Sequence, residues 1–202
     1  WYNLGGDSFE KFVIDSTVIG TQCVSPGDIN GDGIIVEDIA SMDLGEFAWW
    51  ENPGNRTDPW DKHLIGNKMP YAHHVVAVDM NRDGLIDVLG TSFLSSKIVW
   101  YENDGTTSDW DSHTVALNLG GAVTAMPADF DGDGDIDVAG AAWGINRLMW
   151  YENTDGSAES WQTHFVATGF IGAWSLACGD FDNNGRIELA SPSSEVGGAI
   201  AS

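Results

Sequence analysis

The chain has 202 residues, which fits one domain of ordinary size or a segment of a larger one, and its 43% hydrophobic content is enough for a core. A formal net charge of −23, from 31 acidic and 8 basic residues, makes it a poor partner for nucleic acid or an anionic membrane surface. No run of 18 apolar residues is present, so we expect no membrane insertion.

The first residues already belong to a repeat. Related segments are Trp1-Tyr2-Asn3, Trp49-Trp50-Glu51-Asn52, Trp100-Tyr101-Glu102-Asn103 and Trp150-Tyr151-Glu152-Asn153. A second aromatic marker follows each segment, at Phe9, Trp60, Trp110 and Trp161, always 19 residues before an acidic stretch. Such regularity predicts a repeat architecture within one domain, 1–202, with units of approximately 1–48, 49–99, 100–149 and 150–202.

An acidic loop is the next element of each unit, beginning at Asp28, Asp79, Asp129 and Asp180, at intervals of 51, 50 and 51 residues. In the third copy, 129–137, side-chain oxygens occupy positions 1, 3, 5 and 9, with glycine at position 6. Alternate residues of a tight loop point inward, and glycine takes a turn that a Cβ would obstruct, so the layout suits a hard divalent cation. The predicted ligands are Asp28, Asn30, Asp32, Asp79, Asn81, Asp83, Asp87, Asp129, Asp131, Asp133, Asp137, Asp180, Asp182, Asn184 and Glu188.

Two loops depart from the pattern. In the first loop Val36 stands at position 9, with Glu37 and Asp38 after it, so this loop is either one residue longer or impaired. In the fourth loop Asn184 and Glu188 replace aspartates, and we expect weaker binding there.

Between the loops the hydrophobic period is two. Segments such as 75–78, 86–89 and 97–102 are rich in β-branched and aromatic residues, and turn signals such as Asp104-Gly105 separate them. Four short strands per 50 residues predict an all-β fold, a β-propeller of about four four-stranded blades. Kelch units have a similar period but lack the acidic loop, and WD40 units are shorter.

With these loops and the Trp-Tyr-Glu-Asn strands, the whole chain resembles the FG-GAP/VCBS repeat family, the calcium-loop propellers typified by integrin α-subunit heads. The resemblance implies a propeller, structural Ca²⁺ at up to four sites, and an extracellular or cell-surface location. It does not imply one ligand, because the family is functionally mixed. Family propellers are mostly larger than four blades.

The two ends of the chain fall at the same slot of the repeat, since position 13 after Glu188 is Ala201, where other units have tryptophan. The N-terminal pieces could therefore complete the last blade of a small closed ring. The alternative is part of a larger propeller, with open blade edges through which copies self-associate. Cys23 and Cys178 occupy different slots, and we expect two small buried hydrophobic residues, with a disulfide as the alternative.

Residues that break the repeat are the candidates for function. His63, His113 and His164 share one slot, so a structural role is expected for them. The loops on the face opposite the acidic loops vary along the chain. They carry an aromatic, histidine and arginine set that suits a saccharide. The candidate ligand-binding residues are Tyr71, His73, Trp143, Arg147 and Trp174.

Three functions stay open. The first is a secreted, calcium-stabilised recognition module that binds glycan or protein on the face opposite the ions. The second is a catalytic propeller such as a polysaccharide lyase, using Tyr71 with His73 or His74 in proton abstraction. The third is a scaffold without a ligand, part of a larger surface protein. No nucleophile or phosphate-binding motif is present, so we favour a protein that is not an enzyme.

Overall fold

The computed structural model describes residues 2–3, 10–33, 38–43, 46–55, 58–66, 69–193 and 199–201. Within these ranges the regular structure is antiparallel β-sheet, as the alternating pattern predicts, apart from the single-turn 3-10 helix η1 (Trp143–Ile145). No helix in the described ranges has the length and apolar character needed to cross a lipid bilayer.

Three four-stranded sheets follow one another along the chain, and each is a meander in which consecutive strands pair. The first contains β3 (Val24–Gly27), β4 (Asp38–Asp43), β5 (Glu46–Glu51) and β6 (Asp61–Leu64). The second contains β7 (Ala72–Val78), β8 (Asp87–Ser92), β9 (Lys97–Glu102) and β10 (Asp111–Ala116). The third contains β11 (Ala122–Ala128), β12 (Asp137–Ala142), β13 (Arg147–Asn153) and β14 (Trp161–Thr168).

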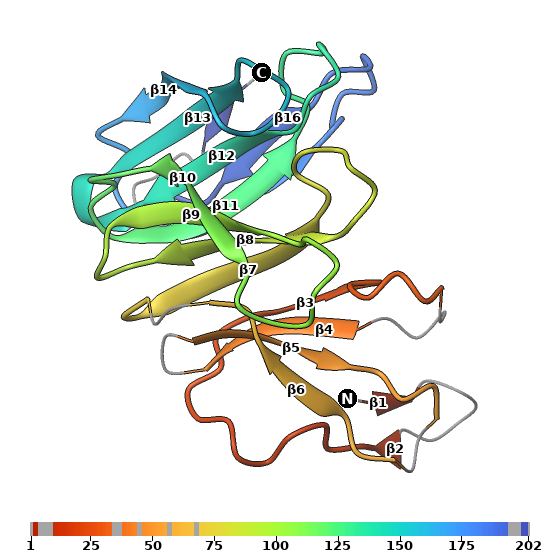
Figure 1. Ribbon diagram of the computed structural model, residues 1–202. Coiled ribbons are helices and arrows are strands. Elements are labelled where there is room, and N and C mark those ends of the chain that lie inside the picture. The colour runs from red at the N-terminus through yellow and green to blue at the C-terminus, as the bar shows by residue number, and fades with distance from the viewer. Residues whose placement is uncertain are drawn as a thin grey trace.

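Two smaller sheets complete the described structure. One pairs β1 (Tyr2–Asn3) with β2 (Glu10–Lys11), and the other contains β15 (Ala177–Gly179), β16 (Glu188–Ser191) and β17 (Ala199–Ala201). The described strands of these two sheets do not pair with each other, and the two chain ends lie at opposite ends of the molecule (Figure 1). The sheets thus succeed one another as propeller blades do, but a closed ring is not shown.

The first strands of the sheets are neighbours: β3 contacts β7, β7 contacts β11, and β11 contacts β15. β7 and β11 point the same way in Figure 1, and each ends directly before an acidic loop. The second and third sheets therefore place the acidic loop at one edge and the turn between the second and third strands at the opposite edge.

Neighbouring sheets pack a bulky side chain against a glycine. Phe47 on β5 lies where a Cβ on Gly90 of β8 would overlap its ring. In the next pair of sheets, a Cβ on Gly140 of β12 would lie 2.8 Å from Cδ1 of Ile98 on β9. Both bulky residues are fully buried. Glycine at these positions therefore permits the close approach on which the core between sheets depends.

Cys23 and Cys178 are not joined by a disulfide in the described residues, and both are half-buried. The Cys23 Sγ lies 3.5 Å from the backbone oxygen of Val75, on the neighbouring first strand. They pack as small side chains against the cores, but they are only partly buried, where the first of the two expectations placed them buried.

Candidate functional site

The acidic loops share a backbone conformation that the sequence shows only in part. Glycine at position 6 has positive φ in each loop, from 71° to 99°. Position 4 is also left-handed, although only two of the four residues there are glycine. The position-4 residues are Gly31 (71°), Arg82 (63°), Gly132 (82°) and Asn183 (60°). Two left-handed residues coil the chain so that alternate side chains face the loop centre.

Side-chain oxygens in the second loop accept backbone N–H groups from within the loop. Gly84 N–H donates to Asp79 Oδ2 (3.0 Å), Asp83 N–H to Asn81 Oδ1 (3.0 Å) and Leu85 N–H to Asp83 Oδ1 (2.8 Å). The remaining Asp79 oxygen, Oδ1, is buried and has no hydrogen-bond partner among the residues that the structure describes. A bound cation can satisfy a buried carboxylate oxygen that no hydrogen-bond donor reaches, so Asp79 Oδ1 suits the role of a metal ligand.

In the second and third loops the position-9 acid links the loop to the end of the third strand. Asp87 is fully buried and accepts N–H groups from Met80 (2.8 Å) and Asn103 (2.8 Å). Asp137 does the same with Phe130 and Asn153, at 3.0 and 2.8 Å. Burial raises the pKa of Asp87 to about 7, against the opposing effect of its two N–H donors. Burial likewise raises the pKa of Asp137.

The third and fourth loops bring three carboxylates together. One oxygen from each of Asp129, Asp131 and Asp137 lies within 4.8 Å of the others, and the same holds for Asp180, Asp182 and Glu188. Asn184 is also in place, since its amide nitrogen lies 3.5 Å from Glu188 Oε1. These donor sets consist of hard oxygens, which fit a divalent cation of the calcium type.

Only part of the first loop can be placed. Asp28 and Asn30 make the same loop contacts as their counterparts, with Gly33 N–H 3.1 Å from Asp28 Oδ2 and Asp32 N–H 3.0 Å from Asn30 Oδ1. Residues 34–37 and the side chain of Asp38 lie outside the described residues. The expected departure at Val36 and Glu37 is therefore not placed.

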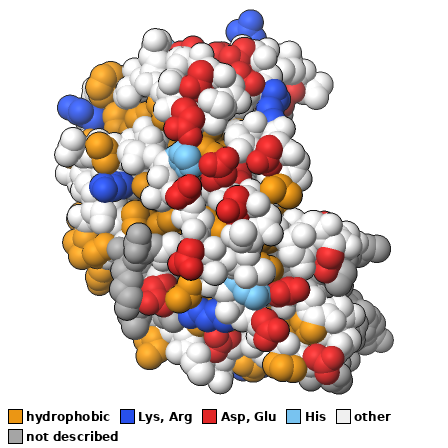
Figure 2. Space-filling view, in the orientation of Figure 1, with side chains coloured by type: hydrophobic (Ala, Val, Ile, Leu, Met, Phe, Trp, Pro, Cys, Tyr) orange, Lys and Arg blue, Asp and Glu red, His pale blue; other side chains and the backbone are white. Residues whose placement is uncertain are grey.

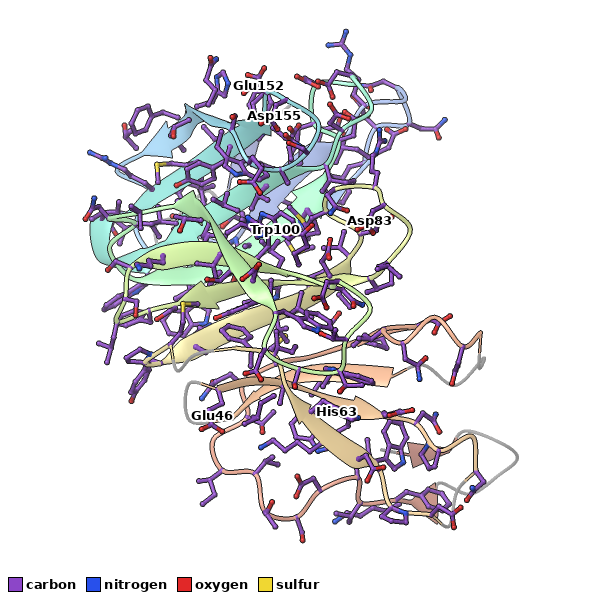
Figure 3. All side chains as sticks on the ribbon, viewed as in Figure 1. Glu46, His63, Asp83, Trp100, Glu152 and Asp155 are labelled. Carbon is purple, nitrogen blue, oxygen red and sulfur yellow. The ribbon has the colours of Figure 1, made fainter. Side chains whose placement is uncertain are left out.

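A hydrogen-bonded chain, which the sequence did not reveal, joins the acidic loop to the outer strand in the first two sheets. In the second sheet the Asn81 amide donates to Glu102 Oε1 (3.1 Å), and Glu102 Oε2 lies 3.0 Å from His113 Nε2. His113 in turn stacks on Trp100, with centroids 4.4 Å apart. The glutamate–histidine and histidine–tryptophan contacts recur around His63 and around Glu152, labelled with Trp100 in Figure 3. The third loop has Asp131 in place of the asparagine, and its carboxylate cannot donate to Glu152. The shared histidine slot therefore serves the sheet geometry.

At the opposite edge, five rings from three successive sheets form what we call the aromatic patch. Its members are Tyr71, His73, Phe93, Trp143 and Trp174. Phe93 lies between Tyr71 and Trp143, at centroid distances of 6.5 and 6.0 Å. Trp174 meets Trp143 edge-on at 6.1 Å and His73 edge-on at 5.2 Å.

Three of these rings are open to solvent: Tyr71, Trp143 and Trp174 are 68%, 47% and 48% exposed. Tyr71 directly precedes β7, Trp143 directly follows β12 and Trp174 lies shortly before β15, all at the strand ends away from the acidic loops. In Figure 2, exposed hydrophobic side chains gather along the left edge, where β7 and β11 begin, while acidic side chains cover the front. Four of the five candidate ligand residues therefore lie together in the patch. Phe93 lies there too, although the sequence did not indicate it.

Arg147 is the candidate that does not join the patch. Its guanidinium lies over the ring of Phe165 on β14, 5.4 Å from the centroid. His74, the other candidate for proton abstraction, is partly buried, and its pKa is lowered to about 4, chiefly by burial and then by the neighbouring His73. The histidine that faces the other rings is His73, whose Nδ1 donates to the backbone oxygen of Val123 (2.9 Å).

Known proteins resemble the chain in fold and in repeat pattern. Its fold is similar to that of a lectin from Agrocybe aegerita whose structure was described for specific recognition of non-reducing terminal N-acetylglucosamine. The TM-score is 0.63 at 19% sequence identity, and the match covers 94% of this chain. It covers 54% of the lectin, so the chain spans about half the length of that protein. No curated protein sequence matches the chain.

A family model provides the sequence-level assignment. The model of the FG-GAP-like repeat matches twice, over residues 79–140 and 129–191, and each match begins at the first aspartate of an acidic loop. Together the two matches cover more than half of the chain. The chain therefore belongs to the FG-GAP-like repeat family.

Proposed function

We propose that this chain is a calcium-stabilised glycan-recognition module that binds saccharide through the aromatic patch, on the face opposite the acidic loops, in an extracellular or cell-surface setting. The observation that carries the proposal is the convergence of three solvent-exposed rings on one surface. An exposed tryptophan or tyrosine can cover the C–H face of a sugar while its polar edge and neighbouring groups bind hydroxyls. The lectin with a similar fold supports the same class of ligand.

Calcium is assigned the structural role in this proposal. The candidate ligands are the oxygens at positions 1, 3, 5 and 9 of the loops, for example Asp129, Asp131, Asp133 and Asp137. A bound ion would neutralise clustered carboxylates and hold the turn between the first two strands. The side chains themselves already fix the loop coil, because their oxygens accept the N–H groups of residues two positions ahead.

The test is retention on immobilised neutral polysaccharides in calcium-containing buffer, for the wild type and for Trp143→Ala and Trp174→Ala. Loss of a central aromatic contact should weaken binding about tenfold or more. Phe165→Ala is the matched control, since Phe165 is also an exposed ring, 63% exposed, but lies on β14 outside the patch. Equal retention of the tryptophan variants and the wild type would disprove the proposed site.

A further inference from the structure

The residue two positions before His73 belongs to a slot that every repeat holds in the left-handed conformation. The slot residues are Gly20 (φ 81°), Tyr71 (56°), Gly121 (68°) and Gly172 (83°). Their spacing of 51, 50 and 51 residues matches that of the acidic loops. Three repeats use glycine, the residue that this conformation favours, and the second repeat uses tyrosine.

The left-handed backbone has a structural reason that does not involve the side chain. The carbonyl of the slot residue accepts a hydrogen bond from the turn between the second and third strands. Phe93 N–H donates to Tyr71 O (2.9 Å), and Trp143 N–H donates to Gly121 O (3.0 Å) in the next repeat. Glycine satisfies this contact in the third repeat, so the fold does not require a tyrosine at the slot.

The tyrosine ring contributes little to packing. Tyr71 is 68% exposed, and its ring centroid lies 6.5 Å from that of Phe93. A bulky residue with positive φ is a conformational outlier, because Cβ crowds the backbone. Strained backbone positions of this kind cluster at functional sites. Tyr71 thus has an unfavourable backbone conformation, and most of its side chain is exposed to solvent within the aromatic patch.

The polar groups of the patch suit an uncharged ligand. His73 Nδ1 donates to a carbonyl, so in the neutral ring Nε2 is left as an acceptor for a hydroxyl. Among the described residues, the cation–ring contacts are Lys62 with Trp50 and Arg147 with Phe165, and neither involves the patch. A net charge of −23 also disfavours a uronate or sulfated chain.

We infer that Tyr71 is an affinity-determining residue of the proposed glycan site, retained against the backbone preference of its slot, and that the ligand is an uncharged saccharide. This inference rests on the proposed function. It adds a residue whose role is separable from stability, since the repeat itself provides the replacement, Tyr71→Gly.

The experiment measures saccharide affinity and melting temperature for the wild type, Tyr71→Gly, Tyr71→Asn and the control Phe165→Ala. Asparagine tolerates the left-handed conformation but has no ring. Both Tyr71 variants should bind neutral oligosaccharides about tenfold more weakly. Their melting temperatures should stay level or rise by roughly 2–4 °C, because strain is relieved. The control should bind as the wild type does.

The outcomes separate the two proposals. Wild-type affinity in Tyr71→Gly and Tyr71→Asn, with loss in Trp174→Ala, would overturn the role of Tyr71 and leave the glycan site standing. Acidic saccharides bound as tightly as neutral ones would overturn the ligand class. No retention of any saccharide by the folded wild type would remove the proposed function itself. A dimer that Tyr71→Gly converts to monomer would instead assign the patch to contact between copies.

Discussion

The two edges of the sheets follow opposite rules. At one edge the chain repeats the same acidic loop with the same contacts, down to the two N–H groups held by Asp87 and again by Asp137. At the other edge equivalent slots differ, as with Tyr71 against Gly121. Residues that recur in the repeats maintain the sheets, whereas residues that differ between repeats can bind a ligand without destabilising the neighbouring sheets. Substitutions at the two edges should therefore separate stability from binding.

The largest effect should come from removing divalent cations. A site saturated at 100 times its Kd adds about 2.7 kcal/mol to the free energy of unfolding. For a chain of this size, each site lost should lower the melting temperature by about 5–10 °C. The measurement is thermal unfolding in excess calcium and in chelator. Trp174→Ala should show the same calcium dependence as the wild type. Identical melting curves with and without chelator would contradict a stabilising role of cations in the acidic loops.

The next effect is that of Asp87→Ala, which leaves the Met80 and Asn103 N–H groups buried without an acceptor. Each unpaired group costs about 1–3 kcal/mol. We expect a loss of about 2–5 kcal/mol in urea unfolding, against less than about 1 kcal/mol for the half-exposed Trp174→Ala. Equal losses at the two positions would mean that the aromatic edge is structural as well.

A smaller effect should appear as pH dependence of the cation-free protein. The pKa of Asp87 is about 7 in the folded state against an ordinary 3.8, so the folded state binds the extra proton between these values. The contribution of Asp87 to stability should therefore fall as pH rises from about 4 to 7 in chelator, whereas that of His74, whose pKa is lowered to about 4, should rise with pH; the Asp87 contribution is the difference between the wild type and Asp87→Asn. Denaturant midpoints at pH 5 and 7.5 provide the measurement. Asp87→Asn should lose this slope, and calcium should suppress it in the wild type.

The smallest difference concerns equivalent tryptophans in successive sheets. Trp100 Nε1 donates to the Ala158 carbonyl in the next sheet (3.0 Å). Trp150 Nε1 is buried and has no partner in hydrogen-bonding geometry among the described residues, although its N–H slightly lowers the pKa of Asp137. Replacing indole by phenyl should therefore cost about 1 kcal/mol more at Trp100 than at Trp150. Calorimetric unfolding of Trp100→Phe and Trp150→Phe measures the difference. Equal losses in the free energy of unfolding would contradict this prediction.

Local chemistry explains which features could be predicted from the sequence. The acidic loops were predictable because their bonds join residues two to five positions apart, and the strands because β-branched and aromatic residues alternate. The left-handed position 4 was hidden because Arg82 and Asn183 stand where glycine would mark it. The place of Arg147 was not predictable, since its partner Phe165 lies 18 positions away on the neighbouring strand β14. The patch also needed Phe93, whose ring contacts join it to Tyr71 and Trp143, 22 and 50 positions away in the chain.

The glycine contacts between sheets give the stack a direction. Each full pair presents a bulky side chain from the third strand of one sheet, Phe47 or Ile98, to a glycine on the second strand of the next, Gly90 or Gly140. The two sides of a sheet are therefore not alike, one projecting and one recessed. Contacts of this head-to-tail kind extend or close into a ring, whereas a two-fold pairing would set like side against like. The order of the repeats is thus encoded in the same contacts that form the core.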